Sequence, residues 1–125
     1  MRLTITALAL LALLTSCAMP PTYRTTTLDW TGTATWRQFG LSHYHGQCAE
    51  GLHSGAARVF GEWVYPNSIY LAASVCGGDT TTLAVLAHEV AHMTVCGSDE
   101  RCAVTTSARW LRQGITLRAL GWRQP

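Results

Sequence analysis

The chain has 125 residues, of which 48% are apolar and 13% are charged, and its formal net charge is +2. This length predicts one domain at most. So few charges exclude a disordered acidic or basic tail, and they exclude a protein that binds nucleic acid through its net charge. The five cysteines are an odd number, so one of them needs an explanation other than an internal disulfide.

The N-terminus has the pattern of an export signal. Arg2 precedes an apolar run over residues 3–14, and the sequence Thr-Ser-Cys-Ala follows it. The run is too short to cross a bilayer, which takes about 20 helical residues, and it fits a secretory signal peptide. Residues 14–17 resemble a bacterial lipobox, a signal in which Cys17 is lipidated and the chain is cut just before it. A plain signal peptide cut after Ala18 is the alternative.

The lipobox divides the chain into a signal peptide (residues 1–16), a lipid-attached tether (residues 17–27) and a folded domain (residues 28–125). Pro20-Pro21 and a run of threonines favour extended, polar backbone in the tether. The expected location is the bacterial cell envelope, with the lipid in a membrane and the domain facing the periplasm or the exterior. Without the lipid, the protein is periplasmic or secreted.

Either cut leaves four cysteines in the folded part: Cys48, Cys76, Cys96 and Cys102. An even number in an oxidising compartment predicts disulfides, whereas a chain that never meets an oxidant keeps four thiols. The sequence does not decide how they pair. Cys96 and Cys102 flank a short loop and could close it, or each could join a more distant cysteine. A core this small gains useful stability from disulfides or a metal.

The fold class is predicted to be α+β, with a small antiparallel sheet or hairpin followed by two helices. Residues 30–39 predict a strand or a short helix, and residues 41–55, which hold three histidines and three glycines, predict a loop-rich segment. Residues 58–65 and 68–72 are rich in β-branched and aromatic side chains and flank the turn signal Pro66-Asn67. They predict an antiparallel hairpin.

The first helix is expected over about residues 79–95, capped by Asp79 or a following threonine. A second helix is expected over about residues 99–120, with two acidic residues in its first turn. Each helix has an apolar stripe at spacings of three and four. The stripes are Leu83, Leu86, Val90 and Met93 in the first helix, and Val104, Ala108, Leu111 and Ile115 near the second.

The first helix contains the motif H-E-x-x-H, from His88 to His92. Positions i and i+4 share a helix face, so the two imidazoles can bind one Zn²⁺ at about 2.0–2.1 Å. Glu89 lies next to that metal, where it can take a proton from a water molecule and pass one to a leaving amine. The alternative is an exposed helix face, against which the apolar neighbours argue.

A catalytic zinc needs a third protein ligand and one open position. The acidic residues after His92 are Asp99 and Glu100, and no histidine follows. We favour Glu100, because Ala103 lies one turn further on nearly the same face and its small side chain lets the two helices approach closely. Asp99 is the alternative ligand, and a third interpretation is that both acids merely cap the helix.

These residues resemble a minimal gluzincin metallopeptidase, the class with H-E-x-x-H on one helix and a glutamate ligand on the next. Residues 99–103 resemble the E-x-x-A motif of the short gluzincins, and the resemblance covers about residues 69–111. It implies that one Zn²⁺ is bound by His88, His92 and Glu100 and that Glu89 is the general base. It also implies that the strand before the active helix, here residues 68–72, holds an extended peptide or protein substrate by its edge.

The predicted function is therefore zinc-dependent peptide-bond hydrolysis by an exported, lipid-anchored metalloendopeptidase. Tyr70 and His45 are candidates to stabilise the oxyanion or contact the substrate, together with Tyr65, His43 and an arginine. The alternative is a non-catalytic envelope or phage-derived lipoprotein that binds a partner and uses zinc for stability. No nucleic-acid partner is expected, and neither the substrate nor the oligomeric state follows from the sequence.

Overall fold

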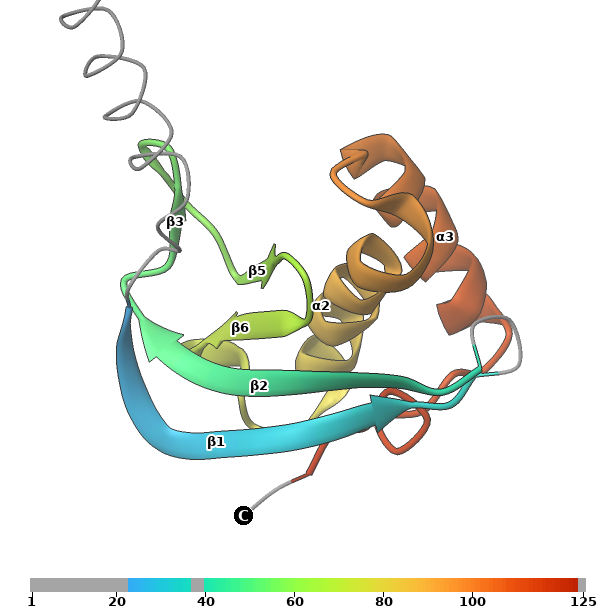
Figure 1. Cartoon of the computed structure of the whole chain (residues 1–125), viewed down its shortest axis with the longest axis horizontal. Helices are drawn as coiled ribbons and strands as arrows, with labels where there is room; N and C mark the ends of the chain where they lie inside the picture. The colour runs from blue at the N-terminus through green and yellow to red at the C-terminus, as the bar shows by residue number, and fades with distance from the viewer. Residues whose placement is uncertain (1–22, 37–39, 124–125) are drawn as a thin grey trace, which may run out of the picture.

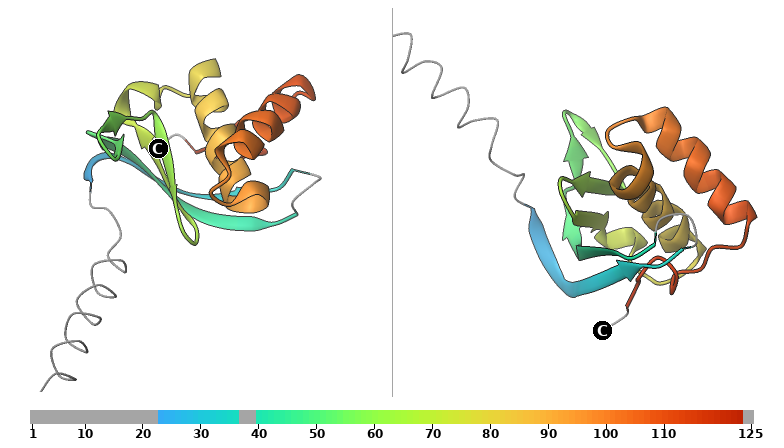
Figure 2. Two further views of the ribbon diagram at one scale, coloured as in Figure 1. Left: turned by 90° about the horizontal axis from the view of Figure 1, so that it is seen from above. Right: turned by 45° about the vertical axis from the view of Figure 1, so that its right-hand side comes forward.

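The computed structural model describes residues 23–36 and 40–123 of the chain. In these ranges the chain forms a mixed β-sheet with two helices on one face (Figures 1 and 2), so the α+β prediction is confirmed. No helix among these residues has the length and apolar character that crossing a membrane requires. The predicted signal peptide and lipidation site, Cys17, lie outside the described residues.

The main sheet has four strands in the order β1-β2-β6-β5. β1 (Arg24–Ala34) pairs antiparallel with β2 (Ser42–Glu50), β2 pairs parallel with β6 (Ser68–Ala72), and β6 pairs antiparallel with β5 (Gly61–Val64). The predicted hairpin is confirmed in β5 and β6. The sheet as a whole is mixed rather than antiparallel, because β5 forms its outer edge and β6 then enters between β5 and β2.

A small ribbon connects β2 to β5. It consists of β3 (His53–Ser54) and β4 (Ala57–Arg58), which pair antiparallel. Its turn contains Gly55, whose φ of 60° lies in the left-handed region that favours glycine. In Figure 1 the ribbon stands across from the two helices, on the other side of β5.

The prediction of a loop-rich segment over residues 41–55 is wrong, because β2 is an inner strand of the sheet. Side chains along β2 alternate between buried positions such as Tyr44 and exposed positions such as His45. Gly46 lies opposite Trp30, and a Cβ there would stand 2.1 Å from the Trp30 ring. The absence of a side chain at Gly46 therefore makes room for the Trp30 indole to lie over β2. Because a glycine occupies this buried position, the alternation of apolar and polar residues typical of a strand is hard to recognise in the sequence.

The folded part also begins earlier than predicted. β1 starts at Arg24, so residues 24–27, which the sequence assigns to the tether, belong to the sheet. Arg24 pairs with Glu50 and Thr25 pairs with Ala49 at the far end of β2. Main-chain pairing with so distant a segment stabilises a strand without leaving a local signal.

The two helices are α2 (Thr80–Ala91) and α3 (Glu100–Arg112), and one π-helical turn, η2 (His92–Cys96), follows α2. The carboxylate of Asp79 caps α2 by accepting the backbone N–H of Thr82 at 3.1 Å. This hydrogen bond is the main reason why the pKa of Asp79 lies below its usual value. The predicted cap and the bounds of the first helix, with η2 included, are confirmed.

The second helix is shorter than predicted and turns a different face inward. It ends at Arg112 rather than near residue 120, and the chain then returns to the sheet, where Thr35 N–H donates to the Ala119 carbonyl at 2.9 Å. Val104 of the predicted apolar face is 53% exposed. The buried side chains are instead Ala103, Thr106, Ser107 and Trp110. Three of these four are small, which allows α3 to lie close to α2.

The core lies between the sheet and the helices. Its largest fully buried side chains include Ile69 and Leu71 from β6, Leu86 and Val90 from α2, and Trp110 from α3. A disulfide joins Cys48 of β2 to Cys76, and a second joins Cys96 to Cys102. The first bond lies within the core, because Cys48 is fully buried and Cys76 is 3% exposed.

Candidate metal centre

A cleft of about 810 Å³ opens between the edge strand β5 and helix α2. Its walls come from the ribbon, from β5, from α2 and from the start of α3. The lining residues are Ser54, Arg58, Val59, Phe60, Gly61, Glu62, Trp63, Tyr65, Ala84, Val85, His88, Glu89, His92, Ser98 and Glu100. The predicted metal triad and the predicted base therefore line one cleft.

Three side chains with metal-ligand atoms converge in the cleft. The Nε2 atom of His88 lies 2.8 Å from one carboxylate oxygen of Glu100, and the Nε2 atom of His92 lies 2.9 Å from the other. One ligand atom from each of the three residues lies within 4.8 Å of the other two. Burial is the main reason why the pKa of His88 is lowered, which favours the neutral imidazole that binds metals. The group could hold a metal ion.

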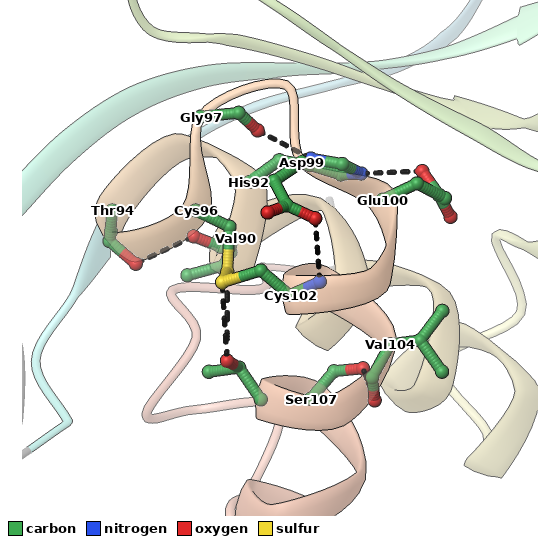
Figure 3. Close-up of a disulfide and its surroundings, with 11 residues drawn as sticks. Val90, His92, Thr94, Cys96, Gly97, Asp99, Glu100, Cys102, Val104 and Ser107 are labelled. Atoms are coloured by element: carbon green, nitrogen blue, oxygen red, sulfur yellow. Dashed lines mark hydrogen bonds and ion pairs between the residues drawn. A yellow bond between two sulfur atoms is a disulfide. The ribbon is translucent and has the colours of Figure 1, made fainter.

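The hydrogen bonds of His92 provide a test of that fit. Its Nδ1 atom lies 2.6 Å from the carbonyl oxygen of Gly97, which can only accept, so Nδ1 carries the proton (Figure 3). In a neutral His92, Nε2 then presents a lone pair to the carboxylate of Glu100. Two electron-rich atoms 2.9 Å apart need a proton or a cation between them. The carbonyl bond also fixes the ring orientation, as second-shell partners of metal-bound histidines do.

Glu89 lies beside these ligands but is held differently. Only 5% of the residue is exposed, and the burial raises the pKa of its carboxyl to about 7. The backbone N–H of Trp63 in β5 donates a hydrogen bond to the carboxylate. The Trp63 ring also stacks on His92, with ring centroids 6.4 Å apart and planes 8° apart. The edge strand therefore positions both the candidate base and one candidate ligand.

The close approach of β5 to α2 depends on Gly61. A Cβ on Gly61 would lie 2.8 Å from Val85 and 2.9 Å from Glu89, so a larger side chain forces one of the two elements to move. We expect Gly61→Ala to lower the free energy of unfolding by about 1–3 kcal/mol, measured by chemical denaturation. Gly77→Ala is the matched control, because a Cβ there meets nothing within 4 Å. Equal stability of the two variants would contradict this account of the contact.

The structure separates the two acids between which the sequence left a choice. The carboxylate of Asp99 caps α3 by accepting the backbone N–H of Cys102 at 3.0 Å. Glu100 is the next residue, and its carboxylate contacts His88 and His92. Only Glu100 therefore belongs to the candidate metal centre, and Ala103 is fully buried beneath it on α3 as the helix approach requires.

The expectation that residues 68–72 offer a free strand edge is wrong. These residues form β6, which is flanked by β2 on one side and β5 on the other. The open edge at the cleft is that of β5 (Gly61–Val64). The resemblance implies that the substrate-binding strand is the last one before the active helix, which is β6. In the hairpin of β5 and β6, however, the earlier strand, β5, is the outer one.

Tyr70 and His45 do not reach the cleft. In β6, Ile69 and Leu71 are buried, so Tyr70 points to the opposite face of the sheet, where its ring packs against Tyr23 at 5.1 Å. His45 is exposed and pairs in parallel register with β6, which places it on that same far face. His43 also lies on β2 and contacts Thr33 at 3.1 Å.

Among the other candidates, Tyr65 and one arginine do line the cleft. Tyr65 is 82% exposed at the end of β5, and its ring packs edge-on against Trp63 with centroids 6.1 Å apart. Arg58 reaches the cleft from the ribbon.

Sequence reasoning missed Trp63 and the structural role of Gly97. Both act on the site through main-chain groups, a donor N–H and an acceptor carbonyl. Every residue carries such groups, so no residue type marks them. Comparisons with protein families, curated proteins and solved structures found no match.

Proposed function

We propose that the protein is a zinc-dependent hydrolase of peptide bonds. The observation that carries the proposal is the buried Glu89, held beside three convergent ligand groups in an open cleft. Two imidazole nitrogens and one carboxylate oxygen are the donor set of many catalytic zinc sites. Three protein ligands leave one coordination position for water or substrate.

Each residue of the site has a role in this proposal. His88, His92 and Glu100 would hold the ion, which when bound supplies a Lewis acid that polarises a carbonyl and lowers the pKa of water. Glu89 accepts a proton from the attacking water and delivers one to the nitrogen of the leaving amine. Tyr65 is the candidate donor to the oxyanion, since this residue lines the cleft whereas Tyr70 lies on the far face.

An extended peptide is the substrate that the cleft supports best. The N–H of Trp63 points away from β6 toward Glu89, so the base lies along the free edge of β5. A peptide that adds to this edge as a further strand passes directly beside the base.

The proposed location is outside the cytoplasm. Two disulfides among the described residues are compatible with an extracellular or periplasmic location. We propose export by the N-terminal signal and attachment of lipid at Cys17. Mass analysis of the mature N-terminus tests both, and a chain that begins at Met19 would contradict the lipid.

Metal analysis tests the centre itself. We expect about one zinc per chain in the exported protein and stabilisation of the fold by about 2.7 kcal/mol at a zinc concentration of 100 times the dissociation constant. Chelation should abolish hydrolysis of a sensitive peptide pool, and added zinc should restore it. Bound zinc with a fourth protein ligand and no turnover would favour the non-catalytic lipoprotein instead. Absence of zinc would refute the metal centre.

A further inference from the structure

The second disulfide lies next to the candidate metal centre along the chain. Cys96 ends η2, which begins at His92, and Cys102 lies in the first turn of α3, which begins at Glu100. The bond therefore closes the segment 97–101, which contains the proposed ligand Glu100 and directly follows the π-helical turn that begins at the proposed ligand His92 (Figure 3).

This segment supplies two of the groups that build the centre. The carbonyl of Gly97 accepts a hydrogen bond from the Nδ1–H of His92, with nitrogen and oxygen 2.6 Å apart, and the carboxylate of Glu100 contacts both imidazoles. The orientation of one ligand and the position of another thus depend on the conformation of five residues.

The core contributes little to the position of these five residues. Their sequence, Gly-Ser-Asp-Glu-Arg, contains no apolar side chain, and the last four residues are exposed. Apart from the disulfide and the contacts with the two histidines, the segment is fixed by main-chain and capping hydrogen bonds. The carboxylate of Asp99 caps Cys102, Asp99 N–H donates to the Cys96 carbonyl at 3.3 Å, and the Asp99 carbonyl accepts the N–H of Ala103 in the first turn of α3 at 3.1 Å. The side chain of Glu100 is 69% exposed, so packing against the core contributes little to its position.

The two disulfides differ in accessibility. Cys48 and Cys76 are buried in the core, whereas Cys96 and Cys102 are each partly exposed. The hydroxyl of Thr106 lies 3.6 Å from the Cys96 sulfur and 3.8 Å from the Cys102 sulfur, which seats the bond on α3. A thiol or disulfide reagent therefore reaches this bond more readily than the other one.

We propose that the Cys96–Cys102 disulfide positions the metal ligands, so that the centre acquires full metal affinity only after this bond has formed. The inference rests on the proposed metal centre. Bond formation removes two protons and two electrons from the two thiols and passes them by exchange to a disulfide oxidant, which is reduced to a dithiol. Metal loading would then be coupled to arrival in an oxidising compartment.

The test compares two disulfide deletions in the exported, oxidised protein. We expect C96A/C102A to weaken zinc binding by about 10–100-fold, the range for groups that orient metal ligands. The affinity is measured by competition with a chromophoric chelator. C48A/C76A is the matched control, in which unfolding of the metal-free protein becomes easier but zinc affinity changes much less. Alanine also removes the thiols, which could otherwise bind zinc themselves.

A second measurement keeps the test decisive if C48A/C76A fails to fold. Mild reduction of the wild-type chain, followed by alkylation and mass analysis, should label Cys96 and Cys102 first, and this species should show the same loss of affinity. In a Glu100→Gln background, removing the disulfide should weaken zinc binding much less, because the main group that it positions is already lost. If the bond only stabilised the fold, its removal would lower zinc affinity by the same factor in the wild-type and Glu100→Gln backgrounds.

The outcomes separate the two proposals. A wild-type protein that binds no zinc would overturn the metal centre and the inference with it. Wild-type and C96A/C102A proteins that bind zinc equally well would overturn the positioning role and leave the proposed hydrolase intact.

Discussion

Replacing Glu89 by glutamine is expected to lower the rate of peptide hydrolysis by about 10²–10⁴-fold, the contribution typical of a general acid–base group. The amide cannot accept a proton from water, but its oxygen still accepts the N–H of Trp63. Because the burial of Glu89 already opposes its charge, a neutral residue fits the site without unfolding it. Turnover of a peptide pool and zinc content are measured on the same preparation, and the zinc should remain.

Glu50→Gln is the control for the same change of chemistry. Glu50 lies on the surface, where it faces Arg24 at 3.8 Å, and exposed ion pairs of this kind contribute little. Hydrolysis by this variant should stay at the wild-type rate. If Glu89→Gln also left hydrolysis unchanged, Glu89 would not be the base, and the proposal of an enzyme would lose its main support.

The parts of the fold that the sequence predicts correctly depend on local periodicity. The apolar stripe of α2 follows the helical repeat, so the same pattern that places Leu86 and Val90 in the core also places His88 and His92 together on one face. The hairpin of β5 and β6 is marked by its turn residues. In both cases the signal lies within a few residues of the structure that it describes.

The parts that it does not predict depend on pairing between distant segments. The inner position of β2 follows from its parallel pairing with β6 and from the packing of Trp30 over Gly46. Without that pairing, neither the face of Tyr70 nor the free edge of β5 can be known. The disulfide between Cys48 and Cys76 likewise becomes evident only when β2 and the segment after β6 lie together in the core.

Asp99 and Glu100 are neighbouring acids whose roles the local sequence does not distinguish. A helix cap and a metal ligand one position apart look alike in sequence, because both are acidic residues at a helix N-terminus. The structure separates them through the direction of each carboxylate. The carboxylate of Asp99 accepts the N–H of Cys102 within its own helix, whereas the carboxylate of Glu100 contacts the imidazoles of His88 in α2 and His92 in η2.

Glu100→Gln is therefore expected to weaken zinc binding by more than about 100-fold, beyond the range typical for groups that only orient ligands. A neutral amide oxygen is a far weaker ligand than a carboxylate, and peptide hydrolysis should fall with the bound metal. Asp99→Asn makes the matched change at the neighbouring residue. Asparagine caps helices about as well as aspartate, so zinc affinity and stability should stay close to wild type.

Metal titration of the two variants, with thermal unfolding of the metal-free forms, checks this pair. The stability of metal-free Glu100→Gln should stay close to that of wild type, because the Glu100 side chain is 69% exposed and ion pairs of exposed groups contribute little. Loss of zinc from Asp99→Asn with retention in Glu100→Gln would reverse the assignment. If both variants lost zinc affinity equally, the two acids would act by shaping the segment 97–101, in which both lie, and neither would be identified as the metal ligand.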